Sequence, residues 1–177
     1  MNSFPCFPWP NALVRGASHQ VWIRRAATSD VERLADYFGA LSCAARYNRF
    51  MGAAASFTRM ARECLMPARP SDGFALIAES REVDGDAVIG EASYGFDRAS
   101  GSGEFAISVA DRFRRKGLGF ALLSALQCRA ISLGHLDLFG ETLKTNDEMQ
   151  SLARKAGFEA TRALDWRAVR FDKRLSP

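Results

Sequence analysis

The sequence has few of the residues from which metal centres are built. Its 177 residues include two histidines and four cysteines, and they share no spacing that metal sites use. We therefore expect no metal ion, and in a cytosolic chain these thiols stay reduced. The residues concerned are His19, His135, Cys6, Cys43, Cys64 and Cys128.

Long apolar runs are also missing. No segment approaches the roughly 20 consecutive apolar residues that cross a membrane. The segment Met1–Pro10 is rich in aromatic residues and proline, but it lacks the cationic start and the apolar core of a signal peptide. These features predict a cytoplasmic protein that has no membrane partner.

The composition is that of an ordinary globular protein, with 47% apolar and 25% charged residues. One domain accounts for this length, and we expect an irregular arm at 1–19 followed by a domain at 20–177. The net charge of +4 and the isoelectric point near 9.1 fit an acidic ligand. The basic residues are not interleaved with stacking aromatic residues, so nucleic acid is not an expected partner.

Two common phosphate-binding motifs are absent. The Rossmann fingerprint needs a third glycine at the position of Leu122, and no Gly-Lys-Ser/Thr run of the Walker A loop occurs. What the chain does have is the sequence RRKGLG at Arg114–Gly119. A strand-like run precedes this turn and a long helix-like run follows it.

This turn has the properties of an anion site. Gly117 and Gly119 let a ligand approach the backbone closely, and the helix start offers unpaired N–H groups and the positive end of the helix dipole. Asp111–Lys116 contains four cations and one acid, a local charge of +3. The alternative is a helix start beside a solvated basic loop. We predict that the turn holds a phosphorylated ligand.

Hydrophobic periodicity and turn signals predict the remaining elements. A first helix is expected at 31–41, and a helical stretch at 44–65 is broken near Gly52. Asp84-Gly85 is a hairpin signal. Thr145 and Glu148 have capping-box spacing, and Gly157 suits a helix end. Further helices are predicted at 118–133 and 146–156, and strands at 20–24, 74–78, 87–96, 104–109, 136–143, 158–164 and 166–171.

The order of these elements defines the fold class. It reads βααββ, then βαβ, then αββ. A helix of about four turns joins strands 104–109 and 136–143, and such a crossover makes the two strands parallel. The sequence therefore predicts a single α+β domain with a mixed, mostly antiparallel sheet of about six or seven strands. It has one parallel step and about four flanking helices.

Two motifs resemble those of the GNAT acyltransferase superfamily. The cofactor motif of that family, Gln/Arg-x-x-Gly-x-Gly/Ala between a strand and a helix, is matched by Arg114–Gly119. Its second mark is an asparagine followed by a short helix that ends in Gly-Phe, as from Asn146 to Gly157-Phe158. The resemblance implies the GNAT fold, N-acetyltransferase activity and acetyl-CoA as the co-substrate.

A narrower resemblance, from about residue 10 to residue 170, is to the GNAT domain of bacterial protein-lysine acetyltransferases. Their Leu-Ser-x-x-Ser-Arg-x-x-Arg-Phe sequence is similar to LSCAARYNRF at 41–50, with Ala45 in place of the second serine. Their Ala-Glu-x-Ala-x-x-Val strand is similar to GEFAISV at 103–109, which places an acid at Glu104.

The resemblance also implies a set of cofactor-binding residues. Backbone N–H groups of the glycine turn would bind the pyrophosphate, with basic side chains adding contacts to the phosphates. The strand before the turn would pair with the pantetheine arm and polarise the thioester carbonyl. Asn146 would bond the same arm, and it is also a suitable helix cap. The implied residues are Ile107, Ser108, Val109, Arg114, Arg115, Lys116, Gly117, Leu118, Gly119, Phe120 and Asn146.

An amine acceptor is mostly protonated at neutral pH, so its acetylation is helped by a base. Glu104 is the first candidate, because strand alternation places it on one face with Ala106 and Ser108. The alternative is an exposed glutamate at a strand end. Glu91 and Glu141 are further candidates, since both lie in predicted strands.

One departure from the family concerns the acid that protonates the leaving thiolate. Many GNAT enzymes place a tyrosine seven residues after the asparagine, where this chain has Ala153. The protein-lysine acetyltransferase group likewise tends to lack this tyrosine. Water is therefore the expected proton donor.

The acceptor is predicted to be a protein lysine. Arg46, Arg49, Arg59 and Arg62 lie in the helical region 41–65, where Glu63 is the only acid. Such a surface suits a protein with acidic residues around its target lysine, although these arginines equally suit solvated helix faces. The alternatives are a small-molecule amine acceptor and an acyl-CoA-binding sensor without turnover. A homo-oligomer is compatible with the sequence.

Overall fold

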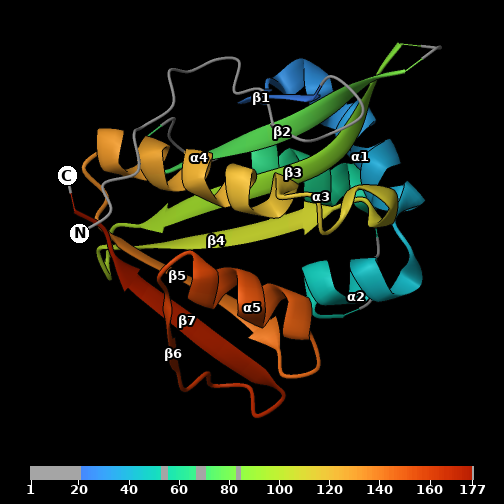
Figure 1. Cartoon of the computed structure of the whole chain (residues 1–177). Coiled ribbons are helices and arrows are strands. Elements are labelled where there is room, and N and C mark those ends of the chain that lie inside the picture. Colours follow the sequence, from blue (N-terminus) through green and yellow to red (C-terminus); the bar gives the residue numbers. More distant parts are fainter. Residues whose placement is uncertain (1–20, 53–55, 67–70, 83–84, 177) are drawn as a thin grey trace.

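The computed structural model describes residues 21–52, 56–66, 71–82 and 85–176, so the predicted arm at 1–19 lies outside the described residues. Seven strands form one mixed sheet in the order β1-β2-β3-β4-β5-β7-β6 (Figure 1). The strands are β1 Val21–Arg25, β2 Gly73–Glu82, β3 Gly85–Asp97, β4 Ser102–Val109, β5 Asp137–Leu143, β6 Glu159–Thr161 and β7 Ala168–Arg174. The helices are α1 Val31–Ala40, α2 Cys43–Phe50, α3 Phe57–Leu65, α4 Leu118–Ser132 and α5 Asp147–Lys155, with 3-10 turns at Thr28–Asp30 and Asp111–Phe113.

Helices cover both faces of the sheet. α4 and α5 lie on one face, α1 and α3 lie on the other, and α2 contacts β4 and β5 (Figure 1). On the first face Leu122 and Leu126 of α4 are fully buried in a cluster with Phe105 of β4. On the second face Leu34 and Phe38 of α1 form a separate buried cluster. Each such side chain stabilises the fold by about 1.5–3 kcal/mol, so both helix layers are held firmly against the strands.

The parallel step between β4 and β5 is short. Only Ser102–Glu104 pairs with Asp137–Phe139, whereas β3 pairs along the whole of β4 and β7 along the whole of β5. Past Glu104 and Phe139 the two parallel strands therefore separate. A Cβ at Gly140 would stand 2.7 Å from the Phe105 ring, so glycine is required where that ring crosses the base of the opening.

The predicted α+β class and the single parallel step are confirmed. There are five α-helices among the described residues instead of about four, because the stretch predicted at 44–65 is divided into α2 and α3. The predicted hairpin is present as the antiparallel β2–β3 pair, although Asp84 itself lies outside the described residues. Gly157 has a φ of 83°, as a helix-ending glycine requires.

The predicted capping box is wrong. Asn146, and not Thr145, is the N-cap of α5, and its side chain accepts a hydrogen bond from the N–H of Met149 at 3.2 Å. The final pair of strands is also displaced from the prediction: β6 is shorter than 158–164, and β7 runs to Arg174. The apolar residues Leu164 and Trp166 that suggested strand lie instead on the surface of the connecting turn.

Candidate active site

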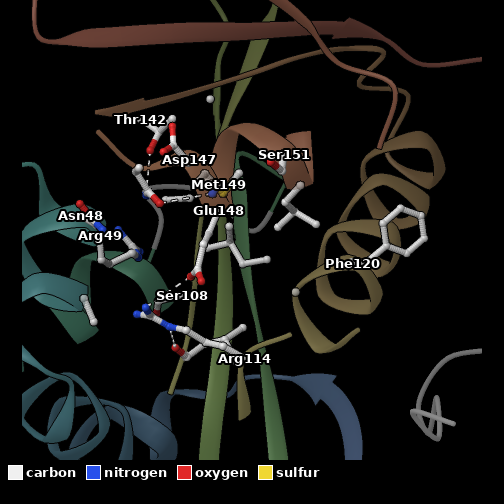
Figure 2. A pocket seen from close by; sticks show the side chains of 18 of the residues that line it. Asn48, Arg49, Ser108, Arg114, Phe120, Thr142, Asp147, Glu148, Met149 and Ser151 are labelled. Carbon is white, nitrogen blue, oxygen red and sulfur yellow. Dashed lines mark hydrogen bonds and ion pairs between the residues drawn. The ribbon is translucent and has the colours of Figure 1, made fainter. Parts of the chain in front are cut away.

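A cleft of about 540 Å³ occupies the space where β4 and β5 separate. It is lined by both strands and by residues of α2 and the starts of α4 and α5. In Figure 2, Asn48 and Arg49 of α2 lie on one side of this cleft and Phe120 of α4 lies on the other. We call this space the first cavity. Nine of the predicted cofactor residues line it: Ile107, Ser108, Val109, Arg114, Arg115, Gly117, Gly119, Phe120 and Asn146.

The glycine turn forms the mouth of the first cavity. Gly117 is the N-cap of α4 with a φ of 84°, a left-handed conformation that residues with a Cβ adopt only with strain. At Gly119 a Cβ would stand 3.2 Å from the Leu152 side chain of α5, so the two helices approach closely there. The turn thus presents the unpaired N–H groups of the first turn of α4 to the cavity.

The basic side chains of the turn are mostly engaged within the protein. Arg114 donates to the carbonyl of Val109 at 3.2 Å and lies 3.5 Å from the carboxylate of Glu148. Arg115 forms a second ion pair with Glu148 at 3.0 Å, and Figure 2 shows Arg114 reaching toward Glu148 across the mouth of the cavity. Glu148 therefore holds α5 against the turn.

Two of the predicted cofactor residues do not line the first cavity. The Lys116 ammonium lies 5.5 Å from the centre of the Phe113 ring, and the Leu118 side chain is buried in the core. Asn146 has the capping role described above and also donates to the Thr142 hydroxyl at 3.0 Å. Ala153, at the position of the family tyrosine, is fully buried and offers no proton donor.

A second cavity, of about 770 Å³, lies beside the first. Both cavities are lined by Arg49 of α2 and Ala106 of β4, so they meet at this strand. Glu104 lines the second cavity only, as does Phe139 where β5 separates from β4. Three further aromatic residues and three acids also line the second cavity, namely Phe50, Tyr94, Phe96, Glu63, Asp72 and Asp97.

Glu104 is an unengaged carboxylate of the second cavity, two residues along β4 from Ala106. Within the described part of the chain it forms neither a hydrogen bond nor an ion pair. Partial loss of hydration raises the pKa of Glu104, and the charge of Glu141 raises it further, against the opposing charges of Arg170 and Arg49. Glu141 itself lines the first cavity.

Glu91 is not placed as a solvent-accessible base. Its side chain is completely buried and accepts a hydrogen bond from Arg49 at 2.5 Å and another from Ser108 at 2.9 Å. Arg49 is likewise buried, so the prediction that it belongs to an exposed acceptor surface is wrong. Sequence reasoning missed this pair. The available signal was an acid at 91 between the apolar residues Ile89 and Ala92 of one strand.

The described residues contain no helix that is long and apolar enough to cross a membrane. Nor do they contain a group of three or more His, Cys, Asp or Glu side chains arranged to hold a metal ion.

The structure is thus a mixed α+β sheet that opens between its two parallel strands, with a glycine turn beside the opening. The family model for the acetyltransferase (GNAT) domain matches residues 20–159. Since this is most of the chain, the protein belongs to the GNAT acetyltransferases, and the predicted family is confirmed.

Solved structures with the same fold include the GNAT domain of S. lividans PAT, which is 22% identical with a TM-score of 0.78 over 94% of this chain and 96% of that domain. The yncA protein from Salmonella typhimurium, solved with its cofactor acetyl-CoA, is 22% identical with a TM-score of 0.67 over 88% of this chain and 94% of that one. A cAMP-binding acyltransferase from Mycobacterium smegmatis is 20% identical with a TM-score of 0.62, and 95% of this chain covers 47% of it. No curated protein sequence matches this chain.

Proposed function

We propose that this acetyltransferase moves the acetyl group of acetyl-CoA directly to a primary amine, and that the amine is the side chain of a protein lysine. One observation carries the proposal. Two cavities meet at Arg49 and Ala106 beside β4, one behind a glycine turn suited to phosphates and the other containing an unengaged carboxylate, Glu104. Such an arrangement lets two substrates enter from different sides and react at the strand.

The first cavity suits acetyl-CoA. The start of α4 would receive the pyrophosphate, and the opening beyond Glu104 and Phe139 would let the pantetheine arm lie along β4. The acetyl-CoA complex of the yncA protein, which has the same fold, supports this assignment. Backbone N–H groups of Ile107–Val109 that face the opening would stabilise the oxyanion that forms on the thioester carbonyl.

The reaction would proceed by direct attack. Glu104 takes a proton from the ammonium of the acceptor, and the amine nitrogen then forms a bond to the acetyl carbon. The carbon–sulfur bond breaks, and the electron pair leaves with sulfur as the CoA thiolate. The attacking nitrogen gives up its second proton to water. Because Ala153 offers no proton, water in the first cavity passes a proton to the thiolate, which leaves as the CoA thiol.

Two of the arginines in the helical region 41–65 are engaged within the protein, because Arg49 is buried against Glu91 and Arg59 pairs with Glu63. The resemblance of residues 41–50 and 103–109 to the bacterial protein-lysine acetyltransferases supports a protein lysine. A small cationic amine is a second candidate, because the aromatic and acidic side chains of the second cavity are the kind that hold a cation.

To test the proposal, the purified protein is incubated with acetyl-CoA labelled on the acetyl group and with a lysate of the source cell. In parallel, free thiol is measured with polyamines, aminoglycosides and amino acids as acceptors. The proposal expects label in discrete protein bands, mapped by mass spectrometry to lysine Nζ and lost with the Glu104→Gln variant. Rapid turnover of a small amine without labelled protein would select the second candidate. Acetyl-CoA binding without transfer to any acceptor would instead identify a sensor.

A further inference from the structure

Arg49 is a buried cation in the wall between the two cavities. Only 9% of its side chain is exposed, yet it lines both spaces. Its guanidinium also lies 5.1 Å from the centre of the Phe50 ring, at the edge of the second cavity. An acceptor ammonium that approaches Glu104 through this cavity must pass close to a fixed positive charge.

Glu91 holds that charge in place. Its carboxylate accepts from Nε of Arg49 at 2.5 Å, while Nη2 of Arg49 donates to the Ser93 hydroxyl at 2.9 Å. The same carboxylate oxygen, Oε1, also accepts from the Ser108 hydroxyl, which is hydrogen-bonded to the Tyr37 hydroxyl. Five side chains from α1, α2, β3 and β4 thus form one hydrogen-bonded chain, and this chain restrains Arg49.

The pairing decides the charge of the second cavity. Glu91 cancels Arg49, so the remaining charged groups among the described lining residues are carboxylates: Glu63, Asp72, Asp97 and Glu104. Three of these are engaged elsewhere, Glu63 with Arg59, Asp72 with Arg98, and Asp97 with backbone N–H groups of its own turn. Without Glu91 the guanidinium would stand unpaired in a medium of low dielectric constant and would repel a cation strongly.

We infer that Glu91 is a specificity-determining residue, which fixes and neutralises Arg49 so that the second cavity admits an amine in its charged ammonium form. Glu91 touches neither substrate; it acts through Arg49. The inference rests on the proposed transfer to an amine and adds a cationic substrate class and the residue that secures it. The inference also gives a role to Glu91, which is too deeply buried to serve as the base.

The experiment compares two acceptors of the same shape. One is Nα-acetyl-lysine amide, whose side chain carries an ammonium at neutral pH. The other is its aminooxy analogue, whose terminal nitrogen is uncharged at that pH. With Glu91→Gln, kcat/KM for the lysine probe falls by about tenfold or more, because Arg49 is left unpaired. For the aminooxy probe it changes by less than about twofold, and acetyl-CoA affinity measured by calorimetry is unchanged.

Two further variants separate charge from folding. Glu79→Gln removes a buried carboxylate that pairs with Arg24 and Arg33 and that lines neither cavity. This variant should lower kcat/KM equally for both probes or leave both values unchanged. The double variant Arg49→Met/Glu91→Met removes both charges and restores discrimination in favour of the lysine probe. If kcat/KM falls equally for both probes in a folded Glu91→Gln protein, the inference is overturned but the proposed function is not. Failure of the wild-type protein to acetylate any amine would overturn the proposed function and the inference together.

Discussion

At the scale of single residues, Glu104 and Glu91 show how position decides the use of a carboxylate. They lie on paired strands and on the same face of the sheet, because Glu91 is opposite Ser108 and Glu104 is opposite Gly95. Glu91 is fully buried and bound by Arg49. Glu104 is exposed to the second cavity and free to accept a proton. Two glutamates that look equivalent in the sequence therefore have different chemistry.

The first prediction concerns Glu104→Gln. The amide keeps the shape of the side chain but cannot take a proton, so kcat falls by about 10²–10⁴. Acetyl-CoA affinity, measured by calorimetry, stays the same. The free energy of unfolding does not decrease in this variant. Folding raises the pKa of Glu104, so its ionised form destabilises the folded state at neutral pH, and the amide removes that cost. Normal turnover by this variant would transfer the role of base to Glu141.

The second prediction concerns pH. Glu104 is active as a base only when ionised, and its raised pKa moves ionisation above the ordinary glutamate value of about 4.3. The acid limb of the kcat/KM profile therefore lies above that value. In Glu141→Gln one of the charges that raises the pKa of Glu104 is removed, so the limb shifts to lower pH. Stability measured by denaturant titration should fall slightly as pH rises through the same interval. An acid limb that does not move in Glu141→Gln would speak against this assignment.

At the scale of elements, local patterns were sufficient to predict most of the fold. The crossover helix at 118–133 and the flanking strands follow from periodicity, and the parallel step follows from the crossover. Local patterns also predicted the turn Arg114–Gly119, because a strand, a glycine pair and a helix start are adjacent in the chain.

Contacts between distant segments were not predictable in this way. Arg49 and Glu91 are 42 positions apart and meet only because α2 lies against β4 and β5, and β4 pairs with β3. The second cavity has the same origin, since its residues come from two helices, three strands and two turns. The capping error at Thr145 has a different cause: Asn146 competes for the same helix end, and its amide also bonds Thr142.

The third prediction tests the glycine turn with a matched pair of variants. Gly117 and Gly134 stand at opposite ends of α4, with φ of 84° and 78° and open space around both. Valine at either position strains the backbone by a similar amount. Gly117→Val should abolish acetyl-CoA binding in calorimetry, whereas Gly134→Val should lose stability but keep its affinity. Undiminished affinity in a folded Gly117→Val protein would place the phosphates elsewhere.

At the scale of the whole molecule, the two cavities that the proposed function assigns to the two substrates meet at β4. The first cavity opens beside α4 and α5, and the second is lined by α2, α3 and the ends of β3 and β4. Because most of the residues that line one cavity do not line the other, the proposed function expects both substrates to bind at once. The one cysteine in these walls, Cys64, is a poor nucleophile because burial raises the pKa of its thiol.

The central claim is therefore that the acetyl group passes directly between two substrates bound at once, and initial-rate kinetics test it most directly. With the acceptor identified from the lysate, rates of thiol release are measured while acetyl-CoA and acceptor are varied together. Direct transfer predicts double-reciprocal lines that intersect, and a protein that carries no label after incubation with acetyl-CoA alone. Parallel lines, together with a labelled acetyl group on the protein itself, would show a covalent intermediate and would contradict the account.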